Sequence, residues 1–199
     1  MECYAEIGIW RGDTTEAVAK AIPAGGTIHL FDYTDVIDTV LKRLNKLSKQ
    51  IRIVPHANTR KLRDSYNWSL MQMLRTSAVP IFDYIYLDGA HCYDTDALAF
   101  FLLDKLLKVG GYIELDDYTW THDVSMTNHC KQMRAAGKAD AAHLLEETLH
   151  GQFTDTQLKT SHIGEVVDLL VKPMPNYTEI VADRIYRKTD ILAPRSMKP

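Results

Sequence analysis

Short apolar runs alternate with amphipathic stretches from the start of the chain to Trp120. The runs typical of buried strands begin at Glu2 and recur at 27–32, 51–54, 82–87 and 112–115. Between them, apolar residues repeat at helical spacing in four stretches, at 13–22, 36–47, 69–76 and 94–107. This alternation predicts an α/β fold in which a doubly wound, mostly parallel sheet carries helices on both faces.

The pattern weakens after Trp120. Residues 126–149 look largely helical, 165–171 suggest a further helix, and 177–188 suggest a closing pair of strands. Val109–Gly111 is expected to end the helix before it. Because no repeat or linker divides the chain, we expect a single domain over 1–199, with a motif-bearing core at 2–120 and lid, substrate elements and closing strands at 121–199.

Composition narrows the class of function. Hydrophobic residues make up 46% and charged residues 25%, as in a water-soluble globular protein. The net charge of -3 provides no basic field for a nucleic acid, so none is expected as a partner. The sequence shows neither a membrane-length apolar run nor a signal-like leader, and we expect no membrane partner. The three cysteines form no C-x-x-C pair that would suggest zinc or a redox dithiol, and they favour a cytoplasmic location.

A glycine-containing loop joins the first strand to the first helix. It runs Glu6-Ile-Gly8-Ile-Trp-Arg-Gly12-Asp-Thr14, with two glycines four residues apart and an acid before them. A dinucleotide pyrophosphate usually requires G-x-G-x-x-G, so this loop favours a cationic amino-acid ligand. An ordinary glycine turn is the alternative.

Polar residues follow the second and third strands. Asp32 ends the second strand, where a carboxylate can accept both hydroxyls of a ribose, in an adenosine ligand or equally in NAD. Asp32 could instead cap the helix that begins near Asp35. Asn58 follows the third strand, at a place suited to an adenine or to a plain turn.

Carboxylates also end the fourth and fifth strands, at Asp88 and at the pair Asp116 and Asp117. Neighbouring strand ends would bring all three acids together, and such a cluster suits a cation of the magnesium, manganese or calcium type. The alternative is that one acid caps a helix and another is solvated. His91, three residues after Asp88, is the candidate general base, although a lone histidine near a turn is often structural.

With these motifs the chain resembles the class I S-adenosylmethionine-dependent methyltransferases, which have a Rossmann-like fold. The resemblance covers the glycine loop, the block from Phe82 to His91 and the block from Val109 to Tyr118. It extends to the small metal-dependent O-methyltransferases grouped with macrolide-sugar O-methyltransferases and cephalosporin-hydroxylase-like proteins. Catechol O-methyltransferases are similar in plan.

The resemblance implies specific roles for these residues. The expected cofactor is S-adenosylmethionine, bound by Glu6, Gly8, Gly12, Thr14, Asp32, Asn58 and Asp88. The expected metal ligands are Asp88, Asp116 and Asp117, most simply for Mg²⁺, and the expected catalytic residues are His91 and Asp88. The implied reaction is methyl transfer to a hydroxyl of a small-molecule acceptor such as a sugar or phenol.

Two other functions fit the same sheet: an NAD-dependent oxidoreductase and a non-catalytic cofactor-binding protein. The incomplete glycine fingerprint weighs against the first, and the repulsive cost of unused clustered acids weighs against the second. The sequence begins almost at the first strand, without the leading helices that commonly cover the cofactor in this family. We therefore expect the cover to come from the segment between Trp120 and Ser161 or from another subunit, as in a homodimer.

Overall fold

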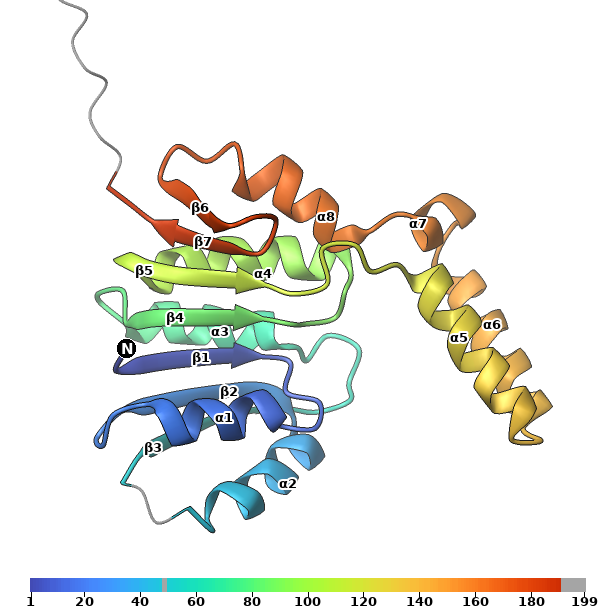
Figure 1. Cartoon of the computed structure of the whole chain (residues 1–199), viewed down its shortest axis with the longest axis horizontal. Helices are drawn as coiled ribbons and strands as arrows, with labels where there is room; N and C mark the ends of the chain where they lie inside the picture. Colours follow the sequence, from blue (N-terminus) through green and yellow to red (C-terminus); the bar gives the residue numbers. More distant parts are fainter. Residues whose placement is uncertain (48–49, 191–199) are drawn as a thin grey trace, which may run out of the picture.

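The computed structural model describes residues 1–47 and 50–190; residues 48–49 and 191–199, which the expected single domain also includes, lie outside the described residues. Its sheet has the strand order β3-β2-β1-β4-β5-β7-β6. Strands β1 to β5 are parallel, and β7 and β6 close the sheet as an antiparallel pair (Figure 1). The strands are β1 (Cys3–Ile7), β2 (Thr27–Tyr33), β3 (Arg52–Asn58), β4 (Phe82–Leu87), β5 (Leu107–Leu115), β6 (Tyr177–Val181) and β7 (Ile185–Lys188). The predicted doubly wound fold and its closing strand pair are confirmed.

Helices cover both faces of the sheet and bury two separate apolar layers (Figure 1). One face carries α1 (Asp13–Ala21) and α2 (Thr34–Leu44). The other carries α3 (Tyr66–Thr76), α4 (Tyr93–Leu106), α8 (His162–Val166) and the π-helical turn η1 (Val167–Val171). Because the central strands are buried on both faces, they read as nearly continuous apolar runs in the sequence.

A helical arm projects beyond the carboxyl ends of the parallel strands (Figure 1). It consists of α5 (His122–Ala135), α6 (Ala139–Gln152) and the short α7 (Asp155–Lys159). Met126, Cys130 and Ala142 form a small core between α5 and α6, and Gly137, at a φ of 72°, divides the predicted helical region into these two helices. Among residues 1–47 and 50–190, no helix combines the length and apolarity needed to cross a membrane.

Strands β5 and β3 have boundaries that differ from the prediction. The segment Val109–Gly111 does not end a helix: α4 ends at Leu106, and β5 begins at once with Leu107. Leu107 pairs with Phe82, the register then shifts, and Gly110 adopts a φ of 85°, so the glycines accommodate a β-bulge inside the strand. Strand β3 is also longer than predicted, because it pairs with β2 along its whole length as far as Asn58.

Candidate active site

The sheet register places the candidate residues in one row. Ile7 of β1 is paired with Phe31 on one side and with Leu87 on the other, and Leu87 is paired with Leu115. The residues that follow these four positions therefore stand side by side at the carboxyl edge: Asp32, Gly8, Asp88 and Asp116. Ligands of doubly wound sheets bind at this edge.

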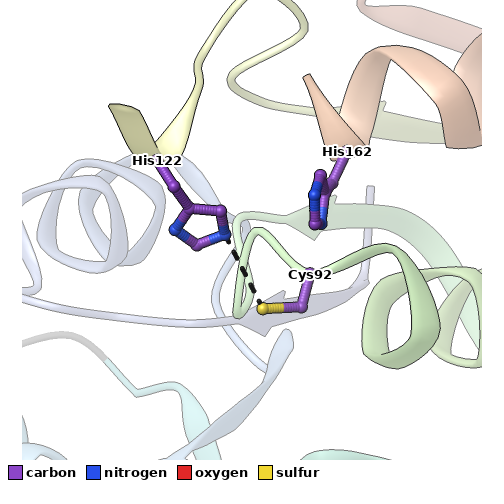
Figure 2. A group of neighbouring side chains, drawn as sticks. All are labelled: Cys92, His122 and His162. Atoms are coloured by element: carbon purple, nitrogen blue, oxygen red, sulfur yellow. Dashed lines mark hydrogen bonds between the residues drawn. The ribbon is translucent and has the colours of Figure 1, made fainter. Parts of the chain in front are cut away.

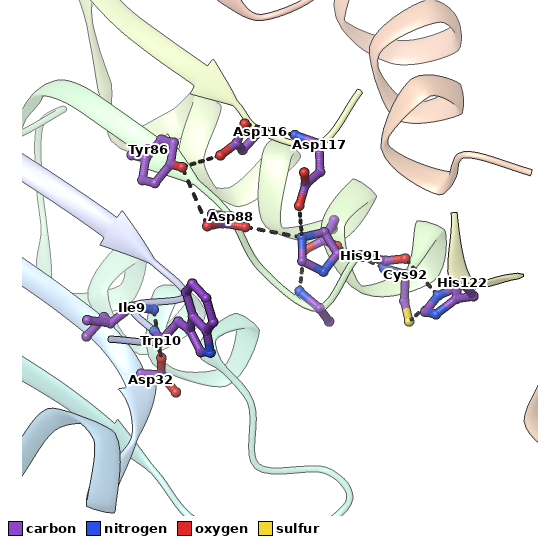
Figure 3. Close-up of polar contacts among 12 residues, drawn as sticks. Ile9, Trp10, Asp32, Tyr86, Asp88, His91, Cys92, Asp116, Asp117 and His122 are labelled. Atoms are coloured by element: carbon purple, nitrogen blue, oxygen red, sulfur yellow. Dashed lines mark hydrogen bonds and ion pairs between the residues drawn. The ribbon is translucent and has the colours of Figure 1, made fainter. Parts of the chain in front are cut away.

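Asp32 organises the glycine loop (Figure 3). Its Oδ2 accepts hydrogen bonds from the backbone N–H of Ile9, at 2.7 Å, and of Trp10, at 3.3 Å. Its Oδ1 accepts one from the N–H of Tyr33, at 2.6 Å. A carboxylate oxygen has about two acceptor sites, so Oδ1 keeps one for a further donor. Asp32 does not cap α2: the N-cap residue of this helix is Tyr33, which makes no side-chain capping hydrogen bond.

The two loop glycines are required by the protein's own packing. Gly8 has a φ of 82°, and a Cβ there would lie 1.7 Å from the carbonyl oxygen of Asp88. Gly12 has a φ of 74° and is the N-cap of α1, where a Cβ would meet Val40 at 2.5 Å. The end of β4 and the helix α2 therefore lie directly against the loop at these two positions. The glycines let the loop lie directly against these elements.

Glu6 is almost fully buried, with 1% exposure, and accepts a hydrogen bond from the Tyr4 hydroxyl at 3.4 Å. Burial raises the pKa of Glu6 to about 8, and the charges of Asp88 and Asp32 act in the same direction. Its side chain stands on the sheet face under the loop. A contact between Glu6 and the cofactor stays a prediction.

Asn58 and Thr14 occupy contrasting surroundings. The Asn58 amide donates to Asp64, to the Ser65 carbonyl and to Ser69, at 3.1 to 3.3 Å, while its buried Oδ1 has no hydrogen-bond partner in the part of the chain that the structure describes. Asn58 therefore organises the segment after β3. Thr14 is exposed near the start of α1 and lines a hollow on the sheet face together with Tyr86, among others.

Three of the predicted catalytic and metal-binding residues converge after β4 and β5 (Figure 3). The Nε2 atom of His91 lies 3.1 Å from Oδ1 of Asp88 and 2.9 Å from Oδ2 of Asp117. Ligand atoms of these three residues lie within 4.8 Å of one another, close enough to share one cation. All three side chains are partly exposed, so the group is open to solvent.

The two carboxylates determine the charge of His91. Burial favours the neutral ring, but the hydrogen bonds and charges of Asp117 and Asp88 outweigh it and raise the pKa of His91 to about 10. The imidazole is thus held as a cation near neutral pH. It occupies the position between two acids that would otherwise repel each other.

Asp116 lies outside this convergent group. The Tyr86 hydroxyl donates a short hydrogen bond to Asp116, and Arg184 Nη1 lies 3.4 Å from its Oδ1. Arg184 stands just before β7 and also binds Glu114 at 2.7 Å. The closing hairpin thereby contributes a positive charge to the active edge, a role for which the sequence showed no motif.

The backbone around these groups is strained. Three non-glycine residues at the carboxyl edge have left-handed φ angles: Trp10 at 50°, His91 at 55° and Asp117 at 63°. Such conformations cost about 1–3 kcal/mol each and tend to cluster at functional sites. Trp10, within the glycine loop, is 75% exposed, and the Trp120 ring lies 4.7 Å from that of His91. The Trp120 ring thus borders the group formed by Asp88, His91 and Asp117.

Sequence analysis missed the residue that holds the loop carrying His91. Asp96 in α4 is fully buried and accepts hydrogen bonds from the backbone N–H of Cys92, at 3.0 Å, and of Ala90, at 3.4 Å. It also accepts a short hydrogen bond from the Tyr66 hydroxyl. In the sequence, Asp96 is only one of two acids near a helix start, so no pattern singled it out.

Comparison with known proteins identifies the family. Residues 5–118, more than half of the chain, match the family described as methyltransferase domain. The chain belongs to the methyltransferase family. The matched segment contains the glycine loop and both acid-ending strands, and the predicted resemblance to methyltransferases is confirmed. A search of the curated proteins found no match.

Solved structures show the same architecture. The methyltransferase is similar to an O-methyltransferase from Bacillus cereus in complex with SAH, at 16% identity and a TM-score of 0.58, over 95% of this chain and 74% of that one. TomG, an O-methyltransferase of tomaymycin synthesis from Streptomyces achromogenes in complex with SAM, matches at 14% identity with a TM-score of 0.57, over the same shares of the two chains. These likenesses establish the Rossmann-like class I methyltransferase fold.

Proposed function

We propose that this methyltransferase transfers a methyl group from S-adenosylmethionine to a hydroxyl oxygen of a small molecule, such as a sugar or a phenol, with help from a divalent cation, most simply Mg²⁺. The observation that carries the proposal is the convergence of Asp88 and Asp117 on one point, in the same row as the glycine loop. The similar proteins in complex with SAH and SAM are O-methyltransferases, which supports oxygen as the acceptor atom.

The glycine loop and Asp32 suit the cofactor. Asp32 holds two loop N–H groups through one oxygen and keeps an acceptor site on the other for a ribose hydroxyl. The carboxylates of Asp32 and Asp88 give this end of the sheet negative charge, which is also felt by the buried Glu6 and which favours the positive charge of a sulfonium. The loop thus offers both hydrogen-bonding capacity and suitable charge.

The donor set of Asp88 and Asp117 suits a hard divalent cation, because both ligands are carboxylate oxygens. Their two oxygens already face a single positive group, the His91 ring. When bound there, a divalent cation supplies positive charge that makes a nearby hydroxyl more acidic. Asp116, held by Tyr86 and Arg184, is the predicted third ligand and would have to exchange at least one of these partners.

In the transfer, the hydroxyl oxygen attacks the methyl carbon, the bond from that carbon to sulfur breaks, and the hydroxyl proton leaves. We assign the proton to His91. In the arrangement described, His91 already carries a proton, because Asp117 and Asp88 keep its pKa near 10. A divalent cation bound by these two carboxylates would neutralise their charge, and the pKa of His91 would then fall. The ring could lose its proton and act as the base. Trp120, which borders the group, and the exposed Trp10 of the glycine loop are candidate walls for the acceptor.

The α5–α7 arm is the proposed cover for the acceptor. It begins directly after the Asp117–Trp120 segment and lies beyond the edge that carries the acids (Figure 1). A second copy of the chain could cover the edge in the same way, and a homodimer therefore belongs to the proposal.

Calorimetric titration with S-adenosylmethionine and, separately, NAD tests the proposal, with and without MgCl₂. We expect the sulfonium cofactor to bind and NAD not to bind. A panel of sugars and phenols, assayed by release of S-adenosylhomocysteine, then provides turnover. Asp88→Asn should lower turnover by about 100-fold or more, because metal assistance contributes several kcal/mol, and should change cofactor affinity far less. Asp94→Asn, at an exposed acid of α4, is the matched control. Equal turnover in Asp88→Asn and wild type would refute metal assistance, and NAD binding would refute the cofactor.

A further inference from the structure

A second group of possible metal ligands lies at the base of the arm (Figure 2). It consists of Cys92, just before α4, His122, at the start of α5, and His162, at the start of α8. Ligand atoms of all three lie within 4.8 Å of one another. His122 and His162 are 8% and 7% exposed, whereas Cys92 is only partly buried and offers a path for an ion from solvent.

The rings are held in place by aromatic packing. Phe153, at the end of α6, stacks on His122 with a centroid distance of 4.4 Å, and Trp120 meets the edge of His122 at 4.7 Å. The His122 and His162 rings are nearly perpendicular to each other, at 5.2 Å. Metal sites need ligands whose orientation is fixed by their surroundings, and this group has such surroundings.

Hydrogen bonds prepare His162 in particular. Its Nε2–H donates to the Gln157 carbonyl at 3.0 Å, and its Nδ1 accepts from the N–H of Tyr93 at 3.1 Å. The single Nδ1 lone pair now accepts the N–H of Tyr93, and metal binding would exchange this hydrogen bond for the ion. A histidine that gives its second N–H to a backbone carbonyl is the usual arrangement of a metal-binding imidazole.

The distance between the other two ligands also suits a metal. Zinc–sulfur and zinc–nitrogen bonds of about 2.3 and 2.0 Å at a tetrahedral angle place the two ligand atoms about 3.5 Å apart. Cys92 Sγ and His122 Nε2 are 3.9 Å apart, so a shift of a few tenths of an ångström suffices. His122 Nε2 now lies 3.1 Å from the carbonyl oxygen of His91, and binding would exchange this contact for the metal.

We propose that Cys92, His122 and His162 form a zinc site, separate from the carboxylate group of Asp88 and Asp117. On binding, the Cys92 thiol releases its proton to solvent and the His122 proton moves to Nδ1, so that one thiolate and two neutral imidazoles face the ion. Three protein ligands leave the fourth position for water. A thiolate and imidazoles select zinc over Mg²⁺, whereas the carboxylates select the reverse.

The site would join three segments that are far apart in sequence. It would tie the starts of α5 and α8, and hence both ends of the arm, to the loop that carries His91. Zinc would therefore fix the base of the arm without contributing to methyl transfer.

Cobalt(II) titration of the chelator-treated protein tests the proposal, because a cobalt–thiolate bond gives a charge-transfer absorption that carboxylates do not. We expect one equivalent to produce this absorption, and one equivalent of zinc to abolish it. Cys92→Ser should eliminate the absorption and weaken zinc binding by more than about 100-fold. Loss of a residue that only hydrogen-bonds to a metal ligand weakens binding by at most about 100-fold. Cys3→Ser, at the other partly buried thiol, should retain both, and so should Asp117→Asn.

Alkylation of the wild-type protein tests the same site without any variant. Zinc should slow the reaction of Cys92 with iodoacetamide, measured by mass spectrometry of the peptides, and should leave Cys3 unchanged. An absorption that persists in Cys92→Ser, an absence of absorption in the wild type, or a Cys92 alkylation rate unaffected by zinc would each overturn the proposal. None of these readouts depends on methyl transfer.

Discussion

Gly8→Ala is the perturbation most directly determined by the structure. Gly8 has a φ of 82°, and an added Cβ would lie 1.7 Å from the Asp88 carbonyl oxygen. Cβ atoms essentially never approach another heavy atom closer than 3.0 Å, so the loop and the end of β4 would have to separate. This change displaces the glycine loop and Asp88 together, because their backbones are in contact.

Two costs add in Gly8→Ala. An alanine in the left-handed region costs about 1–2 kcal/mol, and forcing extra atoms into a packed site costs about 1–3 kcal/mol more. Gly25→Ala isolates the first cost, because Gly25 has a φ of 84° and, among residues 1–47 and 50–190, no atom lies within 4 Å of an added Cβ. The entropy that alanine removes from the unfolded chain is common to both variants. We therefore expect Gly8→Ala to be less stable than Gly25→Ala by about 1–3 kcal/mol.

Urea unfolding of the wild type and both variants measures the difference. Thermal unfolding should separate the two variants by about 2–4 °C for each kcal/mol. Calorimetry should show cofactor affinity reduced by more than about 10-fold in Gly8→Ala and unchanged in Gly25→Ala, since 1.4 kcal/mol corresponds to that factor. If the two variants lost equal stability and bound the cofactor equally well, the close contact between Gly8 and Asp88 would contribute nothing to stability or to binding, and the reasoning would be refuted.

Three further predictions concern other parts of the protein. Burial lowers the pKa of His29 and of His56 to about 4, so below a pH of about 6.5 the unfolded chain binds protons that the folded chain does not bind. The free energy of unfolding should therefore fall as the pH drops from about 6.5 to 4, and the double variant His29→Gln/His56→Gln should show a flatter pH profile in urea titrations. Asp96→Ala leaves the Cys92 N–H and the Tyr66 hydroxyl proton without their acceptor, whereas the Ala90 N–H keeps the Tyr66 oxygen. It should cost about 2 kcal/mol or more, against less than about 0.5 kcal/mol for the exposed Asp94→Ala, and equal melting temperatures would contradict this. Thr154→Ala removes the capping box of α7 and should cost about 1 kcal/mol in denaturant unfolding, with no change in cofactor affinity.

The main elements of the sheet could be predicted because the central strands are buried on both faces. Each appears as an apolar run, and Phe82–Leu87 was predicted with its observed bounds. The row of candidate residues could be predicted for the same reason, since parallel strands end at one edge and each run stops at an acid or a glycine. Asp88, His91 and Asp117 meet at this edge.

The sequence by itself thus determined the fold class, the carboxyl ends of β1, β4 and β5 and the identity of the acids, because these depend on local periodicity and on the residue that follows each strand. Only the tertiary structure decided which partner each acid takes: Asp116 is bound by Tyr86 and by Arg184 from the closing hairpin. It also decided that Val109–Gly111 lies inside a strand, and it brought together Cys92, His122 and His162 from three separate elements. Such contacts depend on register and on the packing of distant segments, and no local pattern in the chain encodes them.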